Sequence, residues 1–311
     1  MEYRKLIDGM RRFGSTEADI CRHMLGVGRE AIRENVILAP WWQPASMPEL
    51  GSARYLSESD FSAIRVWDIE FPSGGCTYIR TGIGAPVLMD VALALGLTAC
   101  RKLIFIGSVG SLTPEIGIGD VVVPEYSICG DGASRYLADS LTKDCFGTRA
   151  RPDAALFETL LRTARNVCAE DGVRCHVGRN FSIDCIFPQY AHIDEILAMG
   201  VNTIEMETAA AFAAARVDFA AVADGQIGAD AGDFDQHPLD RANGTVAPAF
   251  RQGVNVFDQV FQITVHVFVP NFCPIYPFAR RLSPLYRKKT AAGEIFSLLM
   301  NKVLASGIHT T

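Results

Sequence analysis

Short apolar runs that end directly in glycine-rich turns are the feature that most constrains this fold. The run at 101–106 (RKLIFI) leads straight into GSVG, and the run at 76–80 leads into TGIG. Segments with helical periodicity follow at 87–97 and 153–171. Strands that alternate with helices indicate an α/β sheet covered on both faces. Ligands in such sheets bind at the carboxyl ends of the strands, so the glycine turns mark the expected site.

The same reading of periodicity predicts the remaining elements. Further strands are expected at 36–39, 64–71, 120–124, 174–177, 203–206, 219–223 and 257–269. Helices are expected over most of 1–34 and at 191–199, 207–216 and 293–305. Residues 1–244 are predicted to form one domain, because no repeat or linker divides its main part. Residues 245–311 are predicted to be a divergent segment that packs on this domain or at an oligomer interface.

Charge and cysteine content exclude several classes of protein. The net charge of −6 and the pI of about 5.6 argue against nucleic acid as a partner, because phosphate backbones need a basic face. The nine cysteines are scattered and form no CxxC pair, so we expect reduced thiols in the cytoplasm and no metal site. The uncharged run 259–279 carries three prolines, and the N-terminus has no signal-peptide pattern. We therefore expect no membrane association.

Two groups of residues are candidates for chemistry. The turns that contain Gly82 and Ser108 expose backbone N–H groups and a hydroxyl, which suit an anion or a sugar oxygen. The same turns are equally compatible with tight connections that bind nothing. In Glu205-Met206-Glu207, strand alternation predicts both carboxylates on one side and Met206 opposite. Such a pair suits the hydroxyls of a ribose, although a solvated strand end is the alternative.

Asp224 ends an apolar run, at 219–223. Burial at the end of a central strand raises the pKa of a carboxyl and allows it to act as an acid. The residues alone favour the plainer interpretation, a cap or turn Asp ahead of Gly225.

Six segments, in order, resemble the nucleoside phosphorylase family, which includes uridine phosphorylase, hexameric purine nucleoside phosphorylases and nucleosidases. These segments are 81–86 (TGIGAP), 107–112 (GSVGSL), 119–124 (GDVVVP), 131–136 (DGASRY), 177–184 (VGRNFSID) and 199–209 (MGV and EMETA). The resemblance covers roughly half of the chain. It implies a three-layer α/β/α sandwich with a mixed central sheet.

The resemblance also implies a function, the cleavage of the N-glycosidic bond of a purine or pyrimidine nucleoside with phosphate as nucleophile. It implies no cofactor and a homo-oligomer, whether dimer, trimer or hexamer. The implied catalytic residues are Asp224 and Glu207. The implied ribose contacts are Glu205, Met206 and Glu207. The implied base contacts are Phe181, Asp224 and Gln189. The implied phosphate or nucleophile contacts are Gly82, Ser108 and Arg80.

Departures from the family pattern keep two alternatives open. Phe105 stands where the phosphorylases carry a phosphate-binding Arg, and residues 39–44 read APWWQP in place of a phosphate loop with glycine and arginine. Because Phe cannot replace the bidentate fork of Arg, water is the alternative nucleophile. A catalytically silent protein that binds nucleosides is the second alternative.

Overall fold

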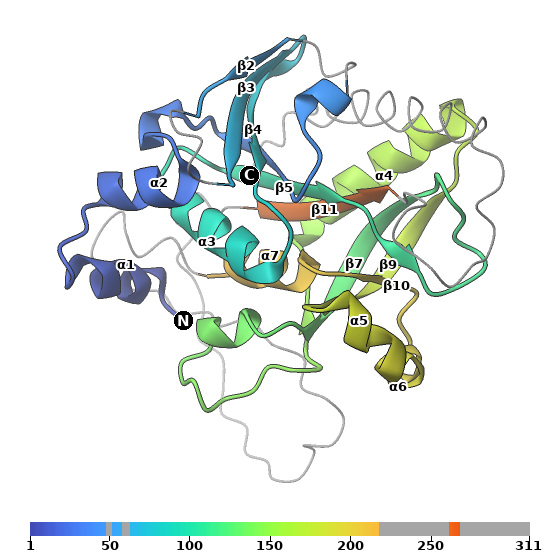
Figure 1. The fold of residues 1–311 in the computed structure, drawn as a ribbon. Helices are drawn as coiled ribbons and strands as arrows, with labels where there is room; N and C mark the ends of the chain where they lie inside the picture. The colour runs from blue at the N-terminus through green and yellow to red at the C-terminus, as the bar shows by residue number, and fades with distance from the viewer. Residues whose placement is uncertain (48–51, 58–62, 218–260, 268–311) are drawn as a thin grey trace, which may run out of the picture.

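The computed structural model describes residues 1–47, 52–57, 63–217 and 261–267. Their strands form a single mixed sheet (Figure 1). Its strand order is β2-β3-β4-β1-β5-β11-β7-β9-β10-β6, and β8 pairs with β7. The strands are β1 (Asn35–Ala39), β2 (Ala53–Tyr55), β3 (Arg65–Phe71), β4 (Gly74–Arg80), β5 (Lys102–Gly107), β6 (Gly110–Ser111), β7 (Val121–Gly130), β8 (Arg149–Ala150), β9 (Cys175–Ile183), β10 (Thr203–Glu205) and β11 (Phe261–Val267).

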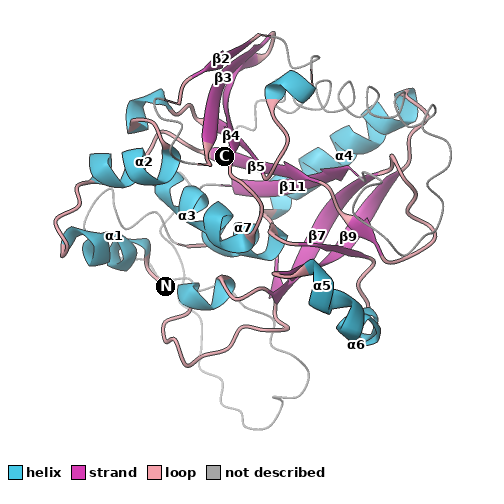
Figure 2. Ribbon diagram, in the orientation of Figure 1, coloured by secondary structure: helices cyan, strands magenta, loops and turns pink. Residues whose placement is uncertain are grey.

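Helices cover both faces of this sheet (Figure 2). They are α1 (Tyr3–Arg11), α2 (Glu17–Leu25), α3 (Ala85–Leu95), α4 (Ala154–Glu170), α5 (Ile186–Gln189), α6 (Ile193–Ala198) and α7 (Thr208–Ala215). Figure 1 shows α1, α2, α3 and α7 on one face and α4 on the other. The expected three-layer sandwich with a mixed sheet is confirmed.

Strand alternation explains the two layers of core. In β1, Val36 and Leu38 pack into the cluster beneath α2, α3 and α7, whereas Ile37 packs into the cluster beneath α4. In β5, Phe105 joins the first cluster and Ile104 the second. Successive side chains of a strand point to opposite faces, so a strand apolar at every position needs a helix layer on each side.

Local signals set where several helices begin. Thr16 and Asp19 form a capping box at the start of α2, and Asp153 caps α4 by accepting a hydrogen bond from the N–H of Leu156. Helix α3 begins after Gly84, whose φ of 114° lies in the region that favours glycine. This backbone geometry brings the amino end of α3 to the site described below.

Most of the expected elements are present, with different lengths. β7 and β9 extend well beyond the expected ranges 120–124 and 174–177, because the two strands pair with each other in parallel as far as Gly130 and Ile183. The short strands β2, β6 and β8 were not expected. The expected elements at 219–223 and 293–305 lie outside the described residues.

β11 comes from the segment 245–311, which we set apart as divergent. It lies in the sheet between β5 and β7, parallel to β5 and antiparallel to β7. The expected strand at 257–269 thus contains a strand at 261–267. The division at residue 244 stays a prediction, because its surroundings lie outside the described residues.

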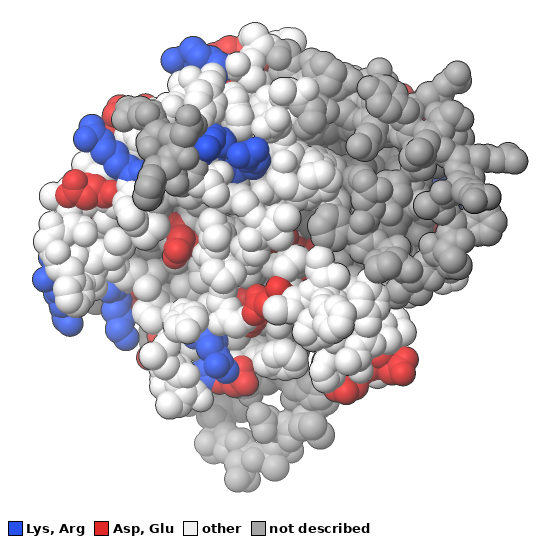
Figure 3. All heavy atoms as spheres, viewed as in Figure 1, with Lys and Arg blue, Asp and Glu red and all other residues white. Residues whose placement is uncertain are grey.

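One face of the protein carries charges of both signs. Figure 3 shows acidic and basic side chains interspersed over the described part of this face. Within the described ranges, no helix combines the length and apolar character needed to cross a bilayer.

Candidate active site

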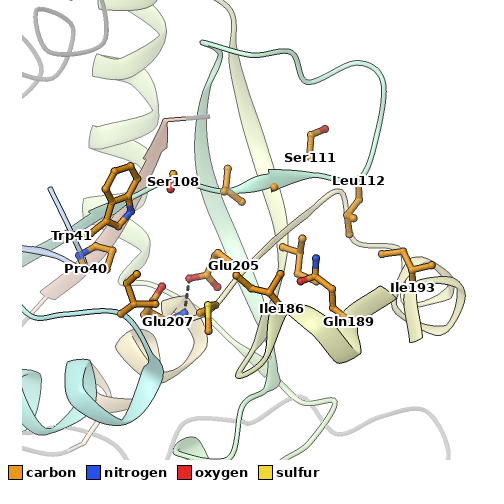
Figure 4. A pocket seen from close by; sticks show the side chains of 15 residues that line it. Pro40, Trp41, Ser108, Ser111, Leu112, Ile186, Gln189, Ile193, Glu205 and Glu207 are labelled. Carbon is orange, nitrogen blue, oxygen red and sulfur yellow. Dashed lines mark hydrogen bonds between the residues drawn. The ribbon is translucent and has the colours of Figure 1, made fainter. Parts of the chain in front are cut away.

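A pocket opens where the carboxyl ends of β1, β5 and β10 meet (Figure 4). Its empty volume is about 710 Å³, open solvent at the mouth included. Five of the expected site residues line it together. They are Ser108, Gln189, Glu205, Met206 and Glu207.

Glu205 ends β10 and is held by a buried polar network. Its Oε1 accepts hydrogen bonds from Asn180 Nδ2 (2.6 Å) and Ser182 Oγ (2.5 Å). Its Oε2 accepts from the backbone N–H groups of Glu207 (2.6 Å) and Thr208 (2.7 Å). Each oxygen therefore already accepts two bonds, and the carboxylate caps the amino end of α7.

The network continues into β7. Ser127 Oγ accepts from Asn180 Nδ2 at 2.8 Å and lies 2.9 Å from Ser182 Oγ. Ser127, Asn180 and Ser182 are all fully buried. Sequence reasoning missed these three residues. The available signal was the polar pair Asn180 and Ser182 at alternate positions of an otherwise largely apolar strand.

Phe181 does not line the pocket, which corrects its expected role as the base-stacking residue. Because β9 runs regularly through Ile183, Phe181 points to the face opposite Asn180 and Ser182. Its ring is 2% exposed and packs with Tyr126 and Ile204. Gly130 makes room for it, since a Cβ there would lie 2.2 Å from the ring.

Glu207 is the second buried carboxylate of the pocket. Its Oε1 accepts a hydrogen bond of 2.7 Å from the N–H of Gly84, at the amino end of α3. Burial and then the charge of Glu205 raise the pKa of Glu207 to about 8. Burial also raises the pKa of Glu205, while its four hydrogen bonds oppose that rise. Glu207 is therefore the group that takes up a proton near neutral pH.

Met206 also lines the pocket, which corrects its expected position opposite the two carboxylates. The expectation extended strand alternation to residue 207. β10 ends at Glu205, and the chain turns at once into α7, so alternation no longer applies.

The walls of the pocket are mostly apolar. In Figure 4, Trp41 and Pro40 lie on one side of the two carboxylates, and Ile186, Gln189 and Ile193 lie on the other. Gln189 is buried and supplies an amide among apolar neighbours. Sequence reasoning missed Trp41, Ile186 and Ile193, because apolar residues in loops and short helices carry no distinctive pattern.

The expected phosphate contacts are only partly brought together. Ser108 lines the pocket, whereas Gly82 and Arg80 are not among the lining residues. Arg80 donates a hydrogen bond of 3.2 Å to Gln43 Oε1. Phe105 is fully buried in the core beneath α3. No Lys, Arg or His is found among the described residues that line the pocket.

Two further expectations concern Asp224 and metals. Asp224, the expected acid for the leaving base, lies outside the described residues. In the described part of the chain, no group of three His, Cys, Asp or Glu side chains is arranged to hold a metal ion.

A family model described as the phosphorylase superfamily matches residues 58–222. This match covers more than half of the chain. The chain belongs to the phosphorylase superfamily.

Curated relatives of this superfamily member match over part of their length. Uridine phosphorylase from Salmonella typhimurium is 29% identical over 158 residues, 46% of this chain and 58% of that protein. Purine nucleoside phosphorylase DeoD-type from Geobacillus kaustophilus is 28% identical over 133 residues, 42% of this chain and 52% of that protein. The chain thus aligns with little more than half the length of these relatives.

Solved structures of the superfamily share the fold over most of the chain. Uridine phosphorylase from Vibrio fischeri ES114 matches with a TM-score of 0.62 at 16% identity, covering 88% of this chain and 92% of that one. AMP nucleosidase from Bacteroides thetaiotaomicron matches with a TM-score of 0.59 at 13% identity, covering 93% and 97%. At these identities the likeness concerns the fold alone.

Proposed function

We propose that this superfamily member cleaves the N-glycosidic bond of a nucleoside. The observation that carries the proposal is the pair of buried carboxylates, Glu205 and Glu207, in one largely apolar pocket. Glycosidic cleavage passes through an oxocarbenium-like transition state with positive charge on the sugar. Preorganised negative charge in a pocket of low dielectric stabilises such a cation.

The two carboxylates take different roles in this proposal. Glu207 holds the ribose hydroxyls, because its carboxylate faces the pocket and accepts fewer hydrogen bonds from the protein than that of Glu205. Glu205 is a positioning residue, because both of its oxygens already accept two protein hydrogen bonds each. Met206 packs against the sugar from the same segment.

The base is proposed to lie toward the wall formed by Gln189 and its apolar neighbours. An amide both donates and accepts, so Gln189 suits the polar edge of a purine or a pyrimidine. Asp224 remains the proposed acid for the departing base. The homo-oligomer also remains a proposal.

Water is the nucleophile that the described pocket favours. Phosphate is a dianion near neutral pH, and binding it beside two carboxylates requires a cation or several N–H donors. The described lining residues include no such cation, and Phe105 is buried in the core. Ser108 and the backbone around it suit a polarised water.

Phosphate is the second candidate, and the comparisons favour it. The aligned relatives are named uridine phosphorylase and purine nucleoside phosphorylase. In this alternative Ser108, Gly82 and Arg80 contribute to the phosphate site, and residues outside the described ranges complete it.

The test is release of free base from a panel of purine and pyrimidine nucleosides, with and without inorganic phosphate. We expect release without phosphate and free ribose as the sugar product. Strict phosphate dependence with ribose 1-phosphate would establish the second candidate instead. Measurable nucleoside binding with no turnover would overturn the enzymatic proposal in favour of a silent binding protein. A Glu207→Ala preparation, purified in parallel, controls for contaminating host enzymes.

A further inference from the structure

Two cysteine side chains meet at the carboxyl end of β7. Cys129 is the next-to-last residue of that strand and is fully buried. Cys145 lies in the connection that leads to β8 and is partly buried. Cys145 packs against the cluster that Cys129 forms with Ala150, Ala209 and Phe212. The two side chains therefore belong to one small group of packed residues.

Backbone hydrogen bonds hold the two segments beside each other. The N–H of Cys129 donates to the carbonyl of Thr148 (2.8 Å), and the N–H of Gly147 donates to the carbonyl of Cys129 (2.8 Å). The Thr148 hydroxyl donates to the carbonyl of Cys145 at 2.7 Å. These bonds hold the connection that carries Cys145 beside the strand that carries Cys129.

The two thiols differ in reactivity. The hydrogen bond from Cys129 lowers the pKa of Cys145, and the same bond together with burial raises the pKa of Cys129. A thiolate is the reactive form, and Cys145 is also the more accessible of the two. Cys145 therefore has the properties of an attacking thiol, and Cys129 those of a resolving one. By contrast, burial raises the pKa values of Cys76 and Cys100 to about 12, which makes them unreactive.

We propose that Cys129 and Cys145 form a peroxide-sensitive dithiol site that closes to an intramolecular disulfide. The Cys145 thiolate attacks one oxygen of hydrogen peroxide, the O–O bond breaks, and the departing hydroxide takes up a proton to give water. Cys145 is then a sulfenic acid. The Cys129 sulfur attacks the Cys145 sulfur, the S–O bond breaks, and the hydroxyl leaves as water with the Cys129 proton. Two thiols lose two electrons in total, and one peroxide becomes two waters.

The position of this pair links it to the candidate active site. Cys129 is paired with Ser182 in the register of β7 and β9, and Ser182 donates to Glu205. The N–H of Ala209, a neighbour of Cys129 in the same cluster, donates to Ser182 Oγ at 2.8 Å. A new bond at Cys129 therefore strains the residues that position Glu205, and we expect it to slow turnover. This consequence, unlike the disulfide itself, rests on the proposed function.

The test uses the full chain, reduced and then treated with hydrogen peroxide. Free thiols are blocked with iodoacetamide, and peptides are mapped by mass spectrometry without reduction. We expect a linked pair of peptides containing Cys129 and Cys145, two hydrogens lighter than the separate thiols and separated again by dithiothreitol. Mapping distinguishes this bond from any bond between Cys168 and Cys175, which form a similar pair at the amino end of β9.

Variants make the test decisive. In Cys129→Ser, with no resolving thiol, we expect a sulfenic acid at Cys145 that dimedone traps. The matched control is Cys185→Ser, which removes an exposed cysteine and should leave the linked peptide unchanged. Oxidation of Cys185 with no Cys129–Cys145 linkage in the folded wild-type chain overturns the proposal.

The effect of the disulfide on nucleoside cleavage is measured in a separate experiment. We expect oxidised wild type to lose at least severalfold in turnover, recoverable with dithiothreitol, and Cys145→Ser to be insensitive to peroxide. A linked pair with unchanged turnover overturns the link to the active site. A linked pair in a chain that cleaves no nucleoside supports the dithiol site and counts only against the proposed function.

Discussion

The two sides of the pocket differ in how much polar structure supports them. On the carboxylate side, Glu205 and Glu207 are buried and tied to the amino ends of α7 and α3. On the nucleophile side, Pro40, Trp41 and Val109 make an apolar surface, to which Ser108 and Ser111 add hydroxyl groups. Among the described residues, many polar groups thus support the carboxylates that suit a cationic sugar, and few polar groups suit an anionic nucleophile.

This difference separates two tasks within one fold. Stabilising a developing positive charge needs buried negative charge, which is costly to maintain and is supported here by an extended network. Binding phosphate needs a cation or several N–H donors, and the described lining residues include no Lys, Arg or His. The predictions below test each side in turn, from the largest expected effect to the smallest.

Glu207→Gln should have the largest effect on activity. The variant keeps the shape and an acceptor for the Gly84 N–H, but it removes the negative charge that Glu207 carries above about pH 8, the pH range in which the two proteins are compared. We expect kcat/KM for nucleoside cleavage to fall by about 10²–10³-fold, the usual cost of removing one group that stabilises transition-state charge. Steady-state kinetics at saturating and limiting nucleoside measure it. An unchanged rate would remove Glu207 from the sugar site.

The same variant tests the pKa of Glu207 through stability. The folded state keeps the proton until about pH 8, whereas the unfolded state releases it near pH 4.5. Stability from this group is therefore complete below pH 4.5 and is lost as pH rises toward 8, by at most about 1.4 kcal/mol per pH unit. Denaturant unfolding of Glu207→Gln should lack this decline. A parallel decline in both proteins would contradict the assignment.

Glu205→Gln should have the largest effect on stability. An amide has one acceptor oxygen, so its NH₂ group must face two of the four donors that now surround Glu205. We expect a loss of about 2–4 kcal/mol in the free energy of unfolding, from unsatisfied buried donors. Urea denaturation measures it, with Glu207→Gln as the matched control. Equal stability of the two variants would mean that the two carboxylates do not differ in role.

The two sides of the pocket also differ in how far their residues could be predicted from the sequence. The layers, most elements and the pocket position follow from apolar runs and glycine turns, because alternation along β1 and β5 places helices on both faces. The pair of carboxylates within one short segment indicated Glu205 and Glu207, and both line the pocket. Phe181 was misplaced, because its motif does not state which face of β9 it occupies. Ser127 was missed, since its contact with Asn180 joins strands 53 residues apart in sequence.

Asn180→Ala should shift a pH profile more than it changes the maximal rate. Removing a donor at 2.6 Å from Glu205 makes the ionised form of that carboxyl less favourable. Glu205 then takes a proton more readily, its repulsion of Glu207 weakens, and the pKa of Glu207 falls. We expect the acid limb of kcat/KM, near pH 8 in wild type, to move to lower pH.

Thr203→Val is the control for Asn180→Ala. Thr203 is equally buried and pairs with Asn180 in the register of β9 and β10, and its hydroxyl has no hydrogen-bond partner. We expect an unchanged pH profile and unchanged or higher stability, because a buried unpaired hydroxyl is replaced by a methyl group. A shift of the limb in both variants would mean that packing, rather than the bond to Glu205, controls Glu207.

Arg80→Ala should have the smallest effect, and it tests the nucleophile side directly. Arg80 ends β4 and donates to Gln43 without lining the pocket, so its charge is not presented to a bound anion there. We expect kcat/KM to change by less than about twofold, which is below 0.5 kcal/mol of transition-state stabilisation. The measurement is nucleoside cleavage across a phosphate titration. A tenfold rise in the KM for phosphate would instead identify Arg80 as the cation that binds phosphate. The pocket would then have charged groups on both sides, and phosphorolysis would be favoured over hydrolysis.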